Sequence, residues 1–84
     1  MNNDKIPFER LRKVLLDLGF VETAIPGPYL FFRHPPSDTI FAYRAYRPRD
    51  SVLWHDFVTT RRQLDERGLL DADTFEALLH EAPV

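Results

Sequence analysis

The sequence predicts an α+β domain with the element order α-β-β-β-α and a short further helix, arranged as a two-layer sandwich. Three observations predict it. Apolar residues recur at helical spacing near both ends of the chain, aromatic-rich segments alternate in the middle, and prolines and glycines separate these segments. Because the strands follow one another with short connections, we expect a three-stranded antiparallel sheet with the helices packed on one face.

The first helix is expected at about residues 7–18, where a proline suits the first turn and apolar residues recur every three to four positions. Gly19 ends it, because glycine readily adopts the left-handed conformation that follows many helices. The short alternating segment 20–24 is expected to be the first strand. The loop at 25–28 contains two prolines and a glycine, which exclude regular structure.

The segment from Tyr29 to Tyr46 predicts a β-hairpin. Both arms are rich in Phe, Tyr and Ile, which suit a half-buried sheet, and residues 35–38 suit a turn. A four-residue loop pairs His34 with Thr39, and the alternation of side chains then gives two faces. The core face carries Leu30, Phe32, Phe41 and Tyr43. The open face carries Tyr29, Phe31, Arg33, Ile40, Ala42, Arg44 and Tyr46.

A second helix is expected at about 52–67, with Asp50 or Ser51 as its cap and Gly68 after its end. Its apolar stripe is Leu53, Trp54, Phe57, Val58 and Leu64, and Trp54 and Phe57 are expected in the core. A short third helix is expected at about 72–81, capped by Asp71. Its inward residues are expected to be Phe75, Leu78 and Leu79.

Length and composition predict a single domain over residues 1–84. Of the 84 residues 44% are hydrophobic and seven are Phe, so a core can form. The absence of cysteine excludes disulfides, thiolate zinc sites and cysteine nucleophiles. No apolar run approaches the roughly 20 residues that span a bilayer, and no signal-peptide pattern opens the sequence. We therefore expect a cytoplasmic protein without a membrane partner.

Charge is distributed unevenly along the chain, whose net charge is −2. Residues 1–49 hold eight Lys and Arg against five Asp and Glu, whereas residues 50–84 hold three against eight. The first part can therefore offer a basic surface, and the second cannot. The overall balance argues against a protein that coats nucleic acid indiscriminately.

Four short segments follow one another in a recognisable order: Leu-Leu-Asp-Leu-Gly-Phe-Val at 15–21, Gly27 with the later Phe-Arg-His-Pro at 32–35, and the segments 63–69 and 74–79. In this order and spacing they resemble the HicA family of small mRNA-cleaving toxins. The resemblance implies the double-stranded-RNA-binding-like α-β-β-β-α fold. It also implies ribonuclease activity and an antitoxin-like protein partner.

The chain departs from the family where the catalytic histidine stands. That histidine follows the glycine in a Gly-Ser-His pattern, and here the sequence is Gly27-Pro28-Tyr29. Cleavage of this kind needs a base that takes the 2′-hydroxyl proton near neutral pH. A histidine with the ordinary pKa of about 6.5 is largely neutral at pH 7, whereas only about one tyrosine in a thousand is deprotonated. We therefore expect RNA binding without efficient cleavage.

The strongest functional pattern in residue types is arginine interleaved with aromatic residues, because guanidinium groups bind phosphates and aromatic rings stack on exposed bases. The same pattern also suits an exposed strand edge that charge keeps soluble. The predicted nucleic-acid-binding residues are Arg33, Arg44, Arg47, Arg49, Tyr29 and Tyr46.

Two alternatives remain open. The first is a protein-interaction module whose open face meets an antitoxin-like partner or a second copy of the chain. The second is an active ribonuclease with a rearranged site, for which His34 and Tyr29 are the candidate catalytic residues. No cofactor is indicated, and His55 and His80 lack the spacing of metal ligands.

Overall fold

The computed structural model describes residues 6–24 and 27–80. The predicted helix residue 81 and the first half of the predicted 25–28 loop lie outside them. The elements are α1 (Phe8–Asp17), β1 (Val21–Ala24), β2 (Tyr29–His34), β3 (Thr39–Arg44), α2 (Trp54–Glu66) and α3 (Ala72–His80). This order confirms the predicted α+β class, and each element lies within two residues of its predicted bounds.

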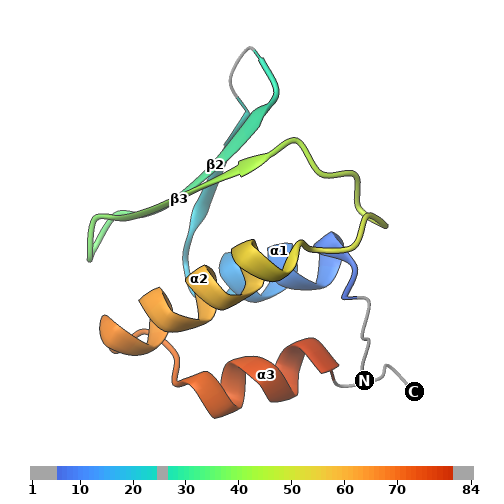
Figure 1. Ribbon diagram of the computed structural model, residues 1–84. Coiled ribbons are helices and arrows are strands. Elements are labelled where there is room, and N and C mark those ends of the chain that lie inside the picture. The colour runs from blue at the N-terminus through green and yellow to red at the C-terminus, as the bar shows by residue number, and fades with distance from the viewer. Residues whose placement is uncertain (1–5, 25–26, 81–84) are drawn as a thin grey trace.

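The strands form one antiparallel sheet in the order β1-β2-β3, and all helices lie on the same side of it. Figure 1 shows α1 and α2 directly beneath the sheet and α3 below these two helices. An ion pair between Arg61 and Glu76 joins α2 to α3, and the Arg10 guanidinium donates to the Leu79 carbonyl. No helix or strand of residues 6–24 and 27–80 covers the opposite face of the sheet, which is called the open face below.

The predicted hairpin register is confirmed. His34 pairs with Thr39, Phe32 with Phe41, and Tyr29 with Arg44. The four-residue turn ends at Asp38, whose φ of 57° lies in the left-handed region that aspartate tolerates better than most residues. Because side chains alternate, this turn fixes which residues of both arms face the helices.

The core lies between the sheet and the helices and is strongly aromatic. Phe8, at the start of α1, makes edge-to-face contacts with Phe32 and Tyr43 at centroid distances of 6.1 and 5.9 Å. Phe20 stacks on Phe41 at 5.4 Å. Deeper in the helical layer, α2 and α3 meet through Phe57 and Phe75. The buried apolar residues are Ile6, Phe8, Leu11, Val14, Leu15, Phe20, Phe32, Phe41, Tyr43, Phe57, Leu64, Phe75 and Leu79.

Gly19 allows α1 to turn directly into β1. Its φ of 101° belongs to the region that favours glycine, and the His34 ring lies 3.6 Å from the place where a Cβ would stand. At that distance an added Cβ would make only ordinary contact with the imidazole, so the cost of a side chain at this position is backbone strain.

The start of α2 differs from the prediction. The helix is preceded by Leu53 rather than by Asp50 or Ser51, and no side chain caps it. The Asp50 carboxylate instead accepts the Arg47 N–H, while a bridge between Pro7 and Ser51 holds this segment against the start of α1. Because the helix begins beyond that anchor, its first residue, Trp54, lies outside the core and is 71% exposed. The expectation that Trp54 is a core residue was therefore wrong.

In α3 the predicted cap is confirmed, because the Asp71 carboxylate accepts hydrogen bonds from the Thr74 N–H and hydroxyl at 3.0 and 2.7 Å. These bonds hold the pKa of Asp71 below its ordinary value. Phe75 and Leu79 are buried as expected, but Leu78 is 39% exposed and only partly faces inward. It borders a shallow groove beside α1 in which Leu18 and Leu70 also lie.

Replacing Phe32 with alanine is expected to lower the free energy of unfolding by about 3–5 kcal/mol, because the ring is fully buried and its loss leaves a cavity. Phe31→Ala, one residue away on the open face, is the matched control and is expected to lower it by well under half as much. Urea unfolding followed by far-ultraviolet circular dichroism measures both. Equal losses would contradict the assignment of the two faces.

Candidate nucleic-acid interface

All three strands contribute to the open face of the sheet. In the paired register, Val21 and Thr23 of β1 lie beside Arg33 and Phe31 of β2. Ile40, Ala42 and Arg44 of β3 complete the rows on the other side. The open face therefore consists of Val21, Thr23, Tyr29, Phe31, Arg33, Ile40, Ala42 and Arg44, all of which are exposed.

Two aromatic rings stand on this face at alternate positions of the central strand. Tyr29 is 52% exposed and Phe31 is 36% exposed. Residues two apart on a strand point the same way and are separated by about 7 Å. This is close to the spacing that lets each ring meet one base of an extended single strand.

The charge on the open face is positive. Arg44 lies directly opposite Tyr29 and makes no ion pair with any residue in 6–24 or 27–80. The Arg33 Nε lies 3.7 Å from the Asp38 Oδ1 at the turn. Both side chains are more than half exposed, so this ion pair is weak. No carboxylate stands among the eight residues of the face. The face can therefore accept phosphates without first displacing a buried ion pair.

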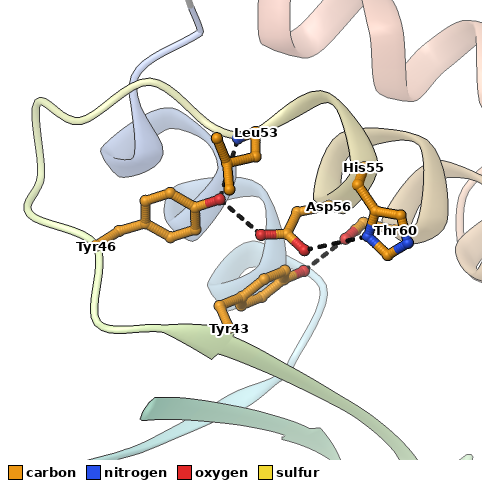
Figure 2. A network of polar contacts seen from close by, with 6 residues as sticks. All are labelled: Tyr43, Tyr46, Leu53, His55, Asp56 and Thr60. Carbon is orange, nitrogen blue, oxygen red and sulfur yellow. Dashed lines mark hydrogen bonds and ion pairs between the residues drawn. The ribbon is translucent and has the colours of Figure 1, made fainter. Parts of the chain in front are cut away.

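Tyr46 does not lie on the open face, and its assignment to that face was wrong. β3 ends at Arg44, whose carbonyl accepts the Tyr46 N–H at 2.7 Å, so the chain turns toward the helices before Tyr46. The Tyr46 ring stacks on Phe8 at a centroid distance of 4.8 Å. Its hydroxyl donates to Asp56 at 2.6 Å and accepts the Leu53 N–H at 3.0 Å, as Figure 2 shows.

The network in Figure 2 joins the end of the sheet to the first turns of α2. Beside Tyr46, the Tyr43 hydroxyl is hydrogen-bonded to the Thr60 hydroxyl at 2.6 Å in the core. Burial, together with the bond to Asp56, raises the pKa of Tyr46 to about 12. Burial also raises the pKa of Tyr43. Both hydroxyls therefore stay protonated at neutral pH and act as structural links.

Arg47 and Arg49 lie on the segment that leaves β3, beside the start of α1. This segment is held there by backbone bonds from Phe8 to Asp50 and from Glu9 to Pro48, at 2.7 and 2.9 Å. Both arginines are exposed. They extend the basic character past Arg44 at one end of the sheet, but they do not stand on the sheet itself.

The two candidate catalytic residues point to opposite faces. Tyr29 is on the open face, whereas His34 is on the core face with 9% exposure and its ring packs 5.1 Å from that of Phe20. The five residue steps from Tyr29 to His34 along β2 correspond to about 17 Å. His34 is hydrogen-bonded to the Ser37 hydroxyl at 2.7 Å, and Ser37 in turn to Thr39, so the imidazole ties the turn together.

The other two histidines lie on helices rather than on the open face. His55 is exposed on α2 at 3.8 Å from Asp56, and His80 ends α3 with its ring hydrogen-bonded to the Glu76 carbonyl. Within residues 6–24 and 27–80 no three His, Asp or Glu side chains gather as metal ligands would. In the same part of the chain, every helix is too short or too polar to cross a membrane.

Comparison with known proteins adds little to this site. No family model and no solved structure matches the chain. Bromodomain and PHD finger-containing protein 3 of Homo sapiens is 31% identical over 68 residues, which cover 77% of this chain and 6% of that protein. The chain thus corresponds to a small part of this curated relative, and the match transfers neither a family nor a function.

Sequence analysis missed the contribution of β1 to the open face. The alternation in residues 20–24 was visible, but it fits either face when the pairing of the strand is unknown. A tight turn fixed the register of β2 with β3, whereas the longer connection before β2 fixes none for β1. The information that orients β1 is a contact with α1. The Glu22 carboxylate accepts a hydrogen bond from the Arg12 guanidinium at 2.8 Å, which places Glu22 on the face of the sheet that the helices cover.

The Tyr46 hydroxyl is expected to make stability depend on pH in the alkaline range. An unfolded tyrosine loses its proton near pH 10, whereas Tyr46 keeps it to about pH 12, so the unfolded state binds fewer protons between these values. The contribution of Tyr46 to the free energy of unfolding is therefore fully present up to about pH 9 and is lost from about pH 10 to about pH 12.

Tyr46→Phe is expected to lower the free energy of unfolding by about 1 kcal/mol at pH 7 and to flatten part of that alkaline fall. Tyr29→Phe, which removes an exposed hydroxyl outside the network, should leave stability at pH 7 unchanged. Urea unfolding at a series of pH values measures both effects. An alkaline fall as steep in Tyr46→Phe as in the wild type would contradict the role given to this hydroxyl.

Proposed function

We propose that this chain is a HicA-like domain that binds single-stranded RNA on the open face of its sheet and does not cleave it efficiently. The observation that carries the proposal is the platform formed by Tyr29 and Phe31, two exposed rings on one face of the central strand with Arg44 opposite Tyr29. Rings at this spacing stack on unpaired bases, and the guanidinium group binds a phosphate between them.

The geometry of the two candidate bases supports binding without cleavage. Tyr29, at the position of the family's histidine, lies on the open face directly opposite Arg44. His34 is buried on the other side of the sheet, where a substrate on the open face does not reach it. An efficient general base must lie within hydrogen-bond reach of the hydroxyl that it deprotonates, so His34 cannot serve RNA bound on the open face, and on that face a phenol stands where the family has an imidazole.

A protein partner of the open face is the second candidate function. It is favoured by Val21 and Ile40, which are 53% and 55% exposed at one end of the face. Exposed β-branched side chains gain little from nucleotides but much from burial against another apolar surface. An antitoxin-like protein that covers this end of the sheet would satisfy them.

Fluorescence anisotropy with labelled single-stranded and double-stranded RNA, at about 50 and about 200 mM salt, tests the proposal. We expect single-stranded RNA to bind more tightly, with affinity that falls as salt increases. Tyr29→Ala is expected to weaken binding about tenfold or more through lost stacking. Arg44→Ala is expected to weaken it and to reduce the salt dependence by about one phosphate contact.

Arg62→Ala is the matched control, because Arg62 is an exposed arginine on α2 away from the open face. It should leave affinity almost unchanged. Gel analysis of the same samples should show intact RNA. RNA that fails to bind at low salt would remove the first candidate and favour the protein partner, whereas cleavage lost in Tyr29→Phe would restore the ribonuclease alternative.

A further inference from the structure

The outer edge of β3 is an unpaired strand edge. The sheet order places β3 last, and no described segment pairs with its outer side. Ala45 donates its N–H to the Pro28 carbonyl, so the pair formed by these residues is a hydrogen-bonded one. Hydrogen-bonded and non-hydrogen-bonded residue pairs alternate along an antiparallel ladder. The backbone groups of Thr39, Phe41 and Tyr43 are therefore the ones that bond to β2. The N–H and C=O groups of Ile40 and Ala42 and the N–H of Arg44 therefore point outward, whereas the Arg44 C=O already accepts the Tyr46 N–H.

In the part of the chain that the structure describes, this edge lacks four features by which proteins commonly block strand addition. Protective features are a very short strand, a proline, a bulge or charged side chains along the edge. β3 has six residues in unbroken register, contains no proline, and carries its single charge at its last residue, Arg44. The other edge strand, β1, has only four residues and carries Glu22 in an ion pair with α1.

A groove of about 260 Å³ runs along this edge, between β3 and α2. α2 runs antiparallel to β3, because Thr60 contacts Tyr43 whereas Asp56 lies further on, beside Tyr46. Asp56 and Arg67 consequently stand at opposite ends of the groove. The uncharged polar residues Thr59, Thr60 and Gln63 lie between them.

We propose that β3 pairs with β3 of a second copy of this chain, so that two sheets join into one of six strands. An antiparallel pair of identical strands has a two-fold axis, and the outward groups of residues 40, 42 and 44 centre that axis on Ala42. Ala42 then exchanges two backbone hydrogen bonds with its counterpart. Ile40 pairs with Arg44 of the other copy, which keeps the two Arg44 charges apart.

Charge complementarity in the groove supports a second copy as the occupant. The two-fold axis reverses the direction of the second α2, which brings its Arg67 end beside the Asp56 end of the first. Each end of the joined groove then holds Asp56 of one copy and Arg67 of the other. The midpoint of α2 between Asp56 and Arg67 also lies beside Ala42 along the strand direction, because Thr60 is hydrogen-bonded to Tyr43, the residue next to Ala42. Backbone pairing and helix charges thus require the same axis.

Sedimentation equilibrium of the RNA-free protein from about 10 to about 500 μM tests the pairing. We expect the average mass to rise with concentration toward twice the chain mass of 9.9 kDa. Arg67→Glu places like charges at both ends of the groove and is expected to weaken the dimer about tenfold. Arg62→Glu, the same charge change at an exposed position of α2 outside the groove, should leave dimerisation unchanged.

Ala42→Pro removes the central outward N–H and is expected to abolish the dimer, whereas Ala42→Thr keeps that N–H and should retain it. Circular dichroism establishes that each variant is folded. A wild-type chain that stays monomeric over the whole range would overturn the proposal, as would equal effects of the two glutamate substitutions. These measurements contain no RNA, so their outcome is independent of the proposed function.

Discussion

The contacts of Phe8 determine how the sheet and the helical layer are joined. This one ring touches Phe32 of β2, Tyr43 of β3 and Tyr46 beyond the sheet, so the first turn of α1 holds three consecutive parts of the chain. The stacking on Tyr46 draws the chain away from the open face once β3 has ended. It also brings the Tyr46 hydroxyl to Asp56 and Leu53, where α2 begins. The position of α2, and hence of the groove beside β3, follows from this aromatic contact.

The open face depends equally on what keeps the other face closed. Phe32, Phe41 and Tyr43 bury their rings against the helices, and alternation then leaves Phe31, Ala42 and Arg44 nothing to pack against. The energetic reason for the exposed aromatic and basic surface is therefore the burial of its neighbours. A one-residue slip at the turn would expose the core rings, so the hydrophobic core itself maintains the register of the proposed binding platform.

Local patterns were sufficient for the elements, the hairpin register and the cap at Asp71, because short-range turn and capping chemistry determines each of them. They were insufficient for Tyr46 and Trp54. Strand alternation would place Tyr46 on the open face only if β3 continued to residue 46. Instead, the Tyr46 ring stacks on Phe8, a residue distant in sequence, and local patterns do not predict such a contact. Trp54 fits the apolar stripe of α2, but the anchoring of the preceding segment to Pro7 decides where the helix starts. Tertiary contacts overruled the local pattern at both residues.

The position of α3 has an electrostatic consequence for ligand approach. Asp71, Asp73 and Glu76 lie on or just before this helix, which stands on the far side of α1 and α2 from the sheet (Figure 1). Asp71 and Asp73 therefore place negative charge on the side opposite the open face of the molecule. Its dimensions are 34 × 29 × 24 Å, against a Debye length of about 8 Å at physiological salt. At low ionic strength these carboxylates repel a polyanion from the α3 side, whereas at physiological salt their field is screened before it reaches the open face.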